Sequence, residues 1–318
     1  MRKLIVTPIF SLFISITVMA TPNSDTGFVE TPIVLHTATG DIFGTLTTPK
    51  MSGNIPVALI IAGSGPTDRN GNNQMMKNES LRKLGYGLAN NNIASLRFDK
   101  RAIGESRKAA KKEADLRFED YVNDARGWIE LLKKDKRFSK VVVVGHSEGS
   151  LIGMIAAFNL ADGYVSIAGA GRSADKIIKE QLANQPQTLK DLSFPIIDSL
   201  VIGKTVTNVD PTLNFLFRQG VQPYLISWFR YDPQLEIKKL TIPVLIVQGT
   251  NDVQVSIEDA NLLAKACTHA QLILIKNMNH IFRIVEGDRD TNIATYSNSS
   301  LPISDELTNG ITEFTRKN

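Results

Sequence analysis

The hydrophobic and polar positions of this chain follow two spacings in turn, and each spacing predicts one kind of element. Apolar and polar residues alternate through 33–48 around the turn Thr39-Gly40-Asp41, which predicts an opening hairpin. A continuous apolar run at 57–63 is typical of a strand that is covered on both faces. Further strands are predicted at 93–99, 141–144, 164–170, 242–249 and 271–276.

Helical spacing separates most of these strands. Within residues 118–134, Tyr121, Ala125, Trp128 and Leu132 recur on one helical face. Other helices are predicted at 80–91, 150–160, 256–267 and 304–317. Because strands that alternate with helices are joined by parallel crossovers, we expect an α/β fold class with a mostly parallel central sheet flanked by helices.

One segment interrupts this alternation. Residues from about 172 to 240 are mostly helical in pattern and rich in aromatic side chains, and they contain no clear buried strand. We interpret them as a helical cap inserted into a single domain of residues 21–318. Five aromatic residues of this segment are candidate walls of an apolar pocket, with core packing as the alternative: Phe215, Phe217, Tyr224, Trp228 and Phe229.

Residues 1–20 have the pattern of a secretory signal peptide. Arg2 and Lys3 precede an apolar stretch from Leu4 to about Val18, and small residues lead up to Ala20. An uncleaved membrane anchor is the alternative, but the stretch is short for a membrane span and contains Pro8. We therefore expect an exported protein, periplasmic or secreted, that keeps no stable membrane anchor after cleavage.

Charge and cysteine content exclude several classes of protein. The sequence has 36 Lys and Arg residues against 32 Asp and Glu residues, and loss of residues 1–20 brings the two numbers closer. This balance does not indicate a nucleic-acid partner. Cys267 is the only cysteine, so an internal disulfide is excluded, and we expect it to be a buried spectator. A local basic cluster is interpreted as a solvated loop face, with a site for an anionic substrate as the alternative: Arg97, Lys100, Arg101, Arg107, Lys108, Lys111 and Lys112.

The residues Gly145-His146-Ser147-Glu148-Gly149 follow the valine strand and precede a helix. A serine at such a sharp turn stands above the sheet edge, and the glycines allow the backbone to fold tightly around it. The positive end of the following helix points at the same place. The pattern predicts that Ser147 is a catalytic nucleophile, and a glycine-rich connecting turn is the alternative.

A serine nucleophile needs a base, and the base needs a carboxylate. His280 follows the last predicted strand, where a loop can reach back over the serine turn, so we predict it to be the base. Asp252 lies just beyond the strand at 242–249, on the same sheet edge, and is the predicted orienting acid; Asp259 is its rival within a helix pattern. The chain order Ser147, Asp252, His280 is the order expected of α/β-hydrolases.

Two backbone amides are needed to bind the oxyanion. One is the amide of Glu148, directly after the nucleophile, and the other is expected from the loop at 63–72, where Ser64 is the first candidate and Gly65 the second. The side chain of Glu148 either braces the turn through a buried hydrogen bond or faces the substrate.

These stretches resemble the α/β-hydrolase superfamily over nearly all of the mature chain, and most of all the bacterial serine carboxylesterases of the dienelactone-hydrolase-like group. The resemblance rests on residues 63–72, 98–107 and 145–150, quoted as GSGPTDRNGN, FDKRAIGESR and GHSEGS. Family members usually have Gly at the position of Ala102 and often Asp at that of Asn70. Such relatives hydrolyse short-chain acyl esters without a metal or an organic cofactor, so the resemblance implies a small-molecule ester as substrate.

Other activities stay open at this stage. The same catalytic parts serve thioesterases, peptidases and acyltransferases. A non-catalytic α/β-hydrolase that binds a ligand is a further alternative, which an intact triad disfavours. A metal hydrolase is disfavoured because the chain lacks clustered His and Asp ligands. The oligomeric state is not predicted.

Overall fold

The computed structural model describes residues 27–51, 53–110, 112–183 and 185–318. The predicted signal peptide at 1–20 and Lys111 of the basic cluster lie outside the described residues.

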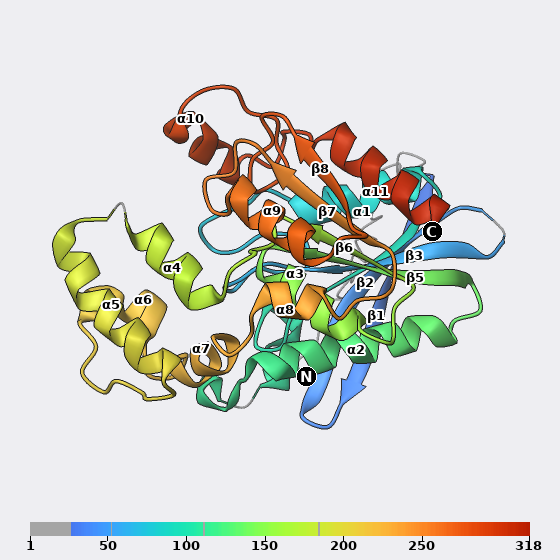
Figure 1. Cartoon of the computed structure of the whole chain (residues 1–318). Coiled ribbons are helices and arrows are strands. Elements are labelled where there is room, and N and C mark those ends of the chain that lie inside the picture. Colours follow the sequence, from blue (N-terminus) through green and yellow to red (C-terminus); the bar gives the residue numbers. More distant parts are fainter. Residues whose placement is uncertain (1–26, 52, 111, 184) are drawn as a thin grey trace, which may run out of the picture.

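A single sheet forms the centre of the described chain (Figure 1). Its strand order is β1-β2-β4-β3-β5-β6-β7-β8. The opening hairpin β1–β2 is antiparallel, β2 pairs antiparallel with β4, and the remaining pairs are parallel. The strands are β1 (Phe28–Thr37), β2 (Gly40–Pro49), β3 (Ile55–Ile61), β4 (Ala94–Phe98), β5 (Phe138–His146), β6 (Gly163–Ile167), β7 (Val244–Gly249) and β8 (Gln271–Ile275). This arrangement confirms the predicted α/β fold class.

The valines of β5 show why a continuous apolar run was needed. Successive side chains of a strand point to opposite faces of the sheet. Val141 and Val143 therefore pack in the core on one face, whereas Val142 and Val144 pack in the core on the other. Helices α2 (Phe118–Lys134), α3 (Glu148–Ala157) and α9 (Ile257–Ala266) contribute to the first core, and α1 (Ser80–Asn90) and α11 (Asp305–Lys317) to the second.

In the described part of the segment where the sequence predicts a cap, five helices lie between β6 and β7. They are α4 (Ala174–Ala183), α5 (Gln187–Val201), α6 (Asn214–Phe217), α7 (Gln222–Trp228) and α8 (Pro233–Ile237). Figure 1 shows α4 to α7 projecting to one side of the sheet, and we call these four helices the cap. In the described part of the chain, none of the helices has the length and apolarity needed to cross a membrane.

Shorter elements complete the chain. Helix α10 (Arg289–Ala294) was not predicted and follows the loop after β8. The 3₁₀ segments among the described residues are η1 (Gly104–Ala109), η2 (Glu113–Asp115), η3 (Pro211–Leu213) and η4 (Thr295–Ser297).

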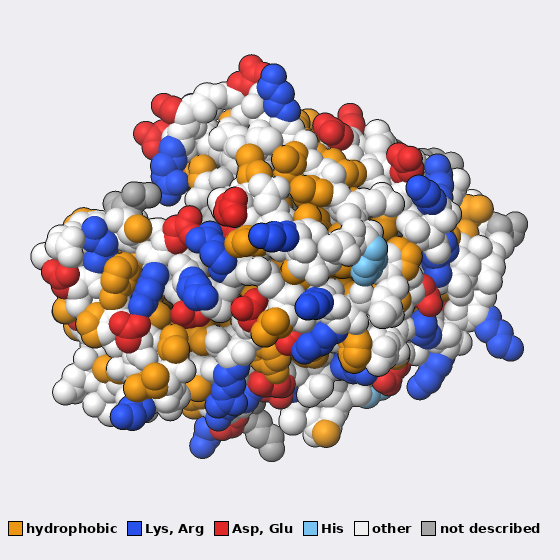
Figure 2. Space-filling model, in the orientation of Figure 1, with side chains coloured by type: hydrophobic (Ala, Val, Ile, Leu, Met, Phe, Trp, Pro, Cys, Tyr) orange, Lys and Arg blue, Asp and Glu red, His pale blue; other side chains and the backbone are white. Residues whose placement is uncertain are grey.

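The basic cluster is only partly a solvated face. Arg107, Lys108 and Lys112 are exposed, but Arg97, Lys100 and Arg101 are buried, so the expectation is wrong for these three. Their partners are the carboxylates of Glu30, Glu148 and Asp124, respectively. A buried cation is costly unless it is paired, and these carboxylates supply the pairing. On the outside, Figure 2 shows basic and acidic side chains interspersed over the face that it presents.

Candidate active site

Ser147 occupies a sharp turn between β5 and α3. Its backbone angles are φ 56° and ψ −122°, a conformation that costs a non-glycine residue about 1–3 kcal/mol. A side chain at Gly145 would clash with the backbone of Gly149, and one at Gly149 would clash with the carbonyl oxygen of Ile61. The two glycines are therefore required by the close approach of the backbone on each side of the serine.

His280 and Asp252 meet at the sheet edge beyond β7 and β8. The Nδ1 atom of His280 lies 2.8 Å from Oδ2 of Asp252, and both side chains are buried. The other carboxylate oxygen accepts hydrogen bonds from the amides of Gln254 and Val255, at 2.8 and 3.0 Å. With a proton on Nδ1, the Nε2 atom of His280 is left as the acceptor that a general base needs.

The electrostatics keep this carboxylate charged. Burial opposes ionisation of Asp252, but attraction to His280, the hydrogen bond from its ring and the two amides together hold the pKa of Asp252 below its usual value. The Nε2 atom of Gln248 adds a contact to Oδ2 at 3.2 Å.

The structure brings the nucleophile turn and the base loop together without a hydrogen bond between the two reactive groups. His146, next to Ser147, packs its ring on the ring of His280 with 4.7 Å between centroids. Within the described residues, the Ser147 hydroxyl makes no hydrogen bond, to His280 or to any other group. Nucleophile–base hydrogen bonds are often long before substrate binds and tighten in the complex.

The other histidines do not compete for the role of base. His146 donates Nε2–H to the backbone oxygen of His280 at 2.9 Å, and burial followed by repulsion from His280 lowers the pKa of His146 to about 3. His36 lies in the opening hairpin, and His269, just ahead of β8, donates to the backbone carbonyl of Ile242 at 3.1 Å.

Two backbone amides beside Ser147 are available to a ligand. Among the residues that the structure describes, neither the amide of Ser64 nor that of Glu148 has a hydrogen-bond acceptor, and both residues line the same cavity as Ser147. The loop passes close to the nucleophile, because a Cβ atom added at Gly63 would lie 3.1 Å from Cβ of Ser147. This arrangement suits the binding of an oxyanion.

Two of the stretches that carry the resemblance brace each other. We call residues 63–72 the oxyanion loop. The Asp68 carboxylate accepts the amides of Asn70 and Asn72 at 2.8 and 2.9 Å, which closes a local turn. The Arg69 amide and guanidinium both bind Asp99, at 2.8 and 2.7 Å, so the loop is tied to the 98–107 stretch.

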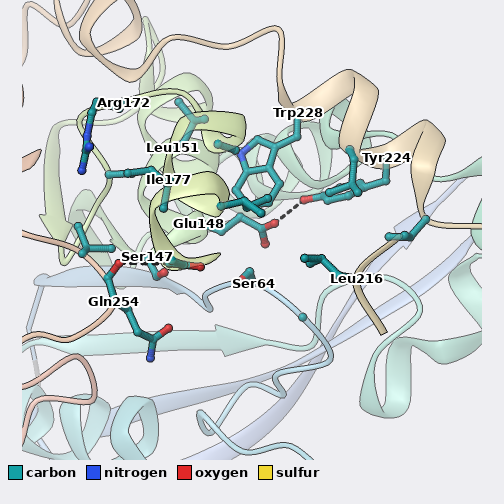
Figure 3. A pocket seen from close by; sticks show the side chains of 18 of the residues that line it. Ser64, Ser147, Glu148, Leu151, Arg172, Ile177, Leu216, Tyr224, Trp228 and Gln254 are labelled. Atoms are coloured by element: carbon teal, nitrogen blue, oxygen red, sulfur yellow. Dashed lines mark hydrogen bonds between the residues drawn. The ribbon is translucent and has the colours of Figure 1, made fainter. Parts of the chain in front are cut away.

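A cavity of about 300 Å³ opens beside Ser147 (Figure 3). Apolar side chains from α3 and the cap form most of its wall: Leu151, Ile177, Ile178, Leu216, Val221, Leu225 and Trp228. Of the five candidate aromatic residues, Phe215, Tyr224 and Trp228 line the cavity, whereas Phe217 and Phe229 are packed in the core.

Several side chains that support the site were missed by the sequence reasoning. Asn279 accepts the amides of Ile281 and Arg283, at 3.2 and 2.9 Å, and donates to Asn292 at 3.0 Å, so it shapes the loop that carries His280. An Asn directly before the candidate base was the available signal, since Asn stabilises turns through such bonds. The sequence offered no comparable signal that Lys100 supports the site.

The alternative candidate residues from the sequence do not take part in the triad. Asp259 caps α9 and forms an ion pair with Arg172 at 2.7 Å, so it is not available to His280. Cys267 is buried, and burial raises the pKa of its thiol. No group of three or more His, Cys, Asp or Glu side chains that could hold a metal ion occurs in the part of the chain that was described.

The sequence and the fold are similar to those of known proteins. A family model described as "Serine aminopeptidase, S33" matches residues 77–213. Esterase EstD of Thermotoga maritima is 28% identical over 261 residues, covering 77% of this chain. The chain spans 58% of the length of that curated relative.

Solved structures share the fold over almost the whole chain. Est1E from Butyrivibrio proteoclasticus has a TM-score of 0.58 at 16% identity, covering 90% of this chain and 99% of that one. The Pyrococcus furiosus esterase Pf2001 has a TM-score of 0.59 at 15% identity, covering 95% and 96%. With its mostly parallel eight-stranded sheet and these structural neighbours, the chain has the α/β-hydrolase fold.

Proposed function

We propose that this protein is a serine hydrolase that cleaves carboxylic esters of small molecules through an acyl-enzyme on Ser147. One observation carries the proposal. The strained serine turn is tied, through His146, to the loop in which His280 is hydrogen-bonded to a buried carboxylate. The names of the relatives, which include several esterases, favour ester bonds as the target.

The reaction would proceed in two steps. Substrate binding brings the Ser147 hydroxyl to Nε2 of His280, which takes its proton as the oxygen attacks the ester carbonyl. Asp252 stabilises the imidazolium, and the amides of Ser64 and Glu148 stabilise the oxyanion. His280 then protonates the leaving alcohol, and water activated by the same ring hydrolyses the acyl-enzyme.

The acyl group would enter the cavity beneath the cap. Its wall is apolar around Trp228 and Leu216, which suits a hydrocarbon chain. Its volume of about 300 Å³ favours short acyl groups, as the resemblance implied. Arg172 and Arg218 also line it, but each is paired with carboxylates, which leaves the wall without a free cation among the described residues.

The family model's description makes a peptidase the second candidate. An aminopeptidase must hold the free ammonium group of its substrate, which calls for an acidic side chain. Of the described residues on the cavity wall, Glu148 is the only acid, and Lys100 and Tyr224 already occupy its oxygens. This arrangement favours neutral esters over peptides with a charged N-terminus.

We also propose that residues 1–20 direct export, so that the hydrolase acts in the periplasm or outside the cell. The positive end, the short apolar stretch and the small residues before Ala20 support this location. Comparing the N-terminus of the protein from a periplasmic extract with that of the full chain tests it. An N-terminus at residue 21 is expected, and an intact Met1 on a cytoplasmic protein would contradict it.

A substrate panel tests the activity. Nitrophenyl esters from acetyl to decanoyl, a thioester and an aminoacyl nitroanilide are compared with the wild-type protein and the Ser147→Ala variant. We expect turnover of the shorter esters, slow or no cleavage of the anilide, and a loss of about 10⁴-fold or more in kcat for the variant. Ester hydrolysis that persists in the variant would contradict the proposal.

A further inference from the structure

A buried lysine outside the triad contacts both segments that carry the oxyanion donors. The Nζ atom of Lys100 lies 2.6 Å from the carbonyl oxygen of Gly63 and 2.7 Å from Oε2 of Glu148. Its side chain is 2% exposed. Lys100 directly follows Asp99, so the same short segment holds the oxyanion loop at two places.

The contact with Gly63 sets the direction of an amide. A trans peptide unit is planar, and its C=O and N–H bonds point in opposite directions. The carbonyl of Gly63 and the amide of Ser64 belong to one such unit, so anchoring the oxygen on one side aims the N–H to the other. The amide of Ser64 has no acceptor among the described residues, and Ser64 lines the cavity beside Ser147.

Through its contact with the Glu148 side chain, Lys100 also holds the residue that carries the second oxyanion donor. Glu148 contributes its backbone amide beside Ser147, and its side chain balances the charge of Lys100. Its other oxygen accepts the hydroxyl of Tyr224, at 2.6 Å, from cap helix α7 (Figure 3). Burial, and then the charge of Glu148, raises the pKa of Tyr224 well above its usual value, so the hydroxyl stays protonated and donates.

Stability alone is a weak reason for this arrangement. A buried ion pair can often be replaced by apolar residues of similar volume with no loss of stability, because removal from water offsets the attraction. The Lys100–Glu148 pair instead links the oxyanion loop, the nucleophile turn and the cap.

We propose that Lys100 is a positioning residue of the oxyanion hole, which acts by holding the Gly63 carbonyl and the Glu148 side chain so that the amides of Ser64 and Glu148 face one point. This inference rests on the proposed serine-hydrolase function. Among the described residues, Lys100 is not part of the cavity wall, and its side-chain hydrogen bonds go to Gly63 and Glu148.

The test removes the charge of Lys100 without leaving Glu148 as an unpaired buried charge. In the double variant Lys100→Met/Glu148→Gln, both side chains keep similar volume, and the glutamine can still accept the Tyr224 hydroxyl. We expect kcat for a nitrophenyl ester to fall about 10²-fold with KM within about twofold, because loss of a single oxyanion donor has an effect of that size. The rate of fluorophosphonate labelling of Ser147 should fall to a similar extent.

A second buried ion pair provides the matched control. Arg101, next to Lys100 in the sequence, forms an ion pair with Asp124, and among the described residues neither side chain is hydrogen-bonded to Gly63. Arg101→Met/Asp124→Asn also removes a buried pair, so its thermal stability should change comparably while kcat stays within about threefold of the wild type. An equal fall in kcat for both double variants, at equal stability, would overturn the inference.

The remaining outcomes separate the inference from the function. A rise in KM with unchanged kcat in the Lys100 variant would place the lysine in substrate binding and overturn its positioning role. Labelling of the wild type with an unchanged rate in the variant would overturn the inference alone. A wild-type protein that neither labels nor hydrolyses esters would overturn both.

Discussion

The Nε2–H of His146 donates to the backbone carbonyl of His280, with 2.9 Å between nitrogen and oxygen. Because His146 directly precedes Ser147, this bond fastens the loop of the base onto the turn of the nucleophile. Phe282 packs edge-on against the His146 ring, with 4.8 Å between the ring centroids. The site therefore depends on a second histidine that stays neutral.

The first prediction concerns the pH dependence of stability. The pKa of His146 is lowered from 6.5 to about 3 in the folded protein, by burial first and then by His280. Between these values the unfolded chain binds a proton that the folded chain does not, so the free energy of unfolding falls as pH decreases from about 6.5 to about 3. The slope from this group is at most about 1.4 kcal/mol per pH unit.

Urea denaturation at a series of pH values checks this against His146→Gln, whose amide can donate in place of Nε2 and does not titrate. The stability difference between wild type and variant should be constant above pH 7 and should shift in favour of the variant below about pH 6. Parallel curves throughout the acid range would refute the assignment.

The second prediction concerns the strain at Ser147. Alanine keeps the Cβ atom in the unfavourable backbone conformation, whereas glycine does not. Both variants should be inactive, but Ser147→Gly should be more stable than Ser147→Ala by about 1 kcal/mol in chemical denaturation. The opposite order is expected at Ala156, where glycine in the regular part of α3 should be destabilising by about 1 kcal/mol.

The third prediction concerns the turn after β4. Ala102 has a φ of 71°, and its amide donates to the carbonyl of Ser106 at 3.2 Å. Relatives in the resembled group usually have glycine there, which adopts this conformation without strain. Ala102→Gly should raise the free energy of unfolding by about 0.5–1 kcal/mol, since the relief of strain exceeds the entropy lost by glycine. A variant that is less stable than the wild type would show that the alanine is not strained.

The fourth prediction concerns the acyl pocket. Trp228 lines the cavity and stacks on Phe118 with 6.1 Å between centroids. Trp228→Ala should shift the maximum of kcat/KM along the nitrophenyl ester series toward longer chains, because it enlarges the apolar wall. Phe217→Leu, a change in a cap aromatic that lies in the core, should leave the maximum in place. Equal profiles for all three proteins would exclude this cavity as the acyl site.

Local patterns were enough to predict the main elements. Residues 118–134 showed helical spacing of their apolar side chains, and α2 has the same bounds. The four valines required a strand with two covered faces, and β5 places them alternately in the two cores. Strand before and helix after are properties of neighbouring residues, which is why the turn at Ser147 could be predicted from the sequence.

Contacts between distant residues could not be predicted in the same way. The sequence predicted a basic surface where the structure has three buried cations, Lys100, Arg97 and Arg101. Their carboxylate partners lie 48, 67 and 23 residues away in the sequence, respectively. The contacts of Asn279 with Asn292 likewise depend on how α10 folds back over the loop. Pairing of this kind is decided by the fold, and a charge or an amide in a sequence does not reveal whether it is paired.

The central claim is that Ser147 is a nucleophile activated by His280. The most direct test is reaction of the purified protein with a fluorophosphonate, followed by mass spectrometry of the peptide that contains residues 145–149. We predict one adduct, on Ser147, no adduct in Ser147→Ala, and a labelling rate at least about 10³-fold lower in His280→Gln. An adduct on another residue, or an undiminished rate in His280→Gln, would contradict the account.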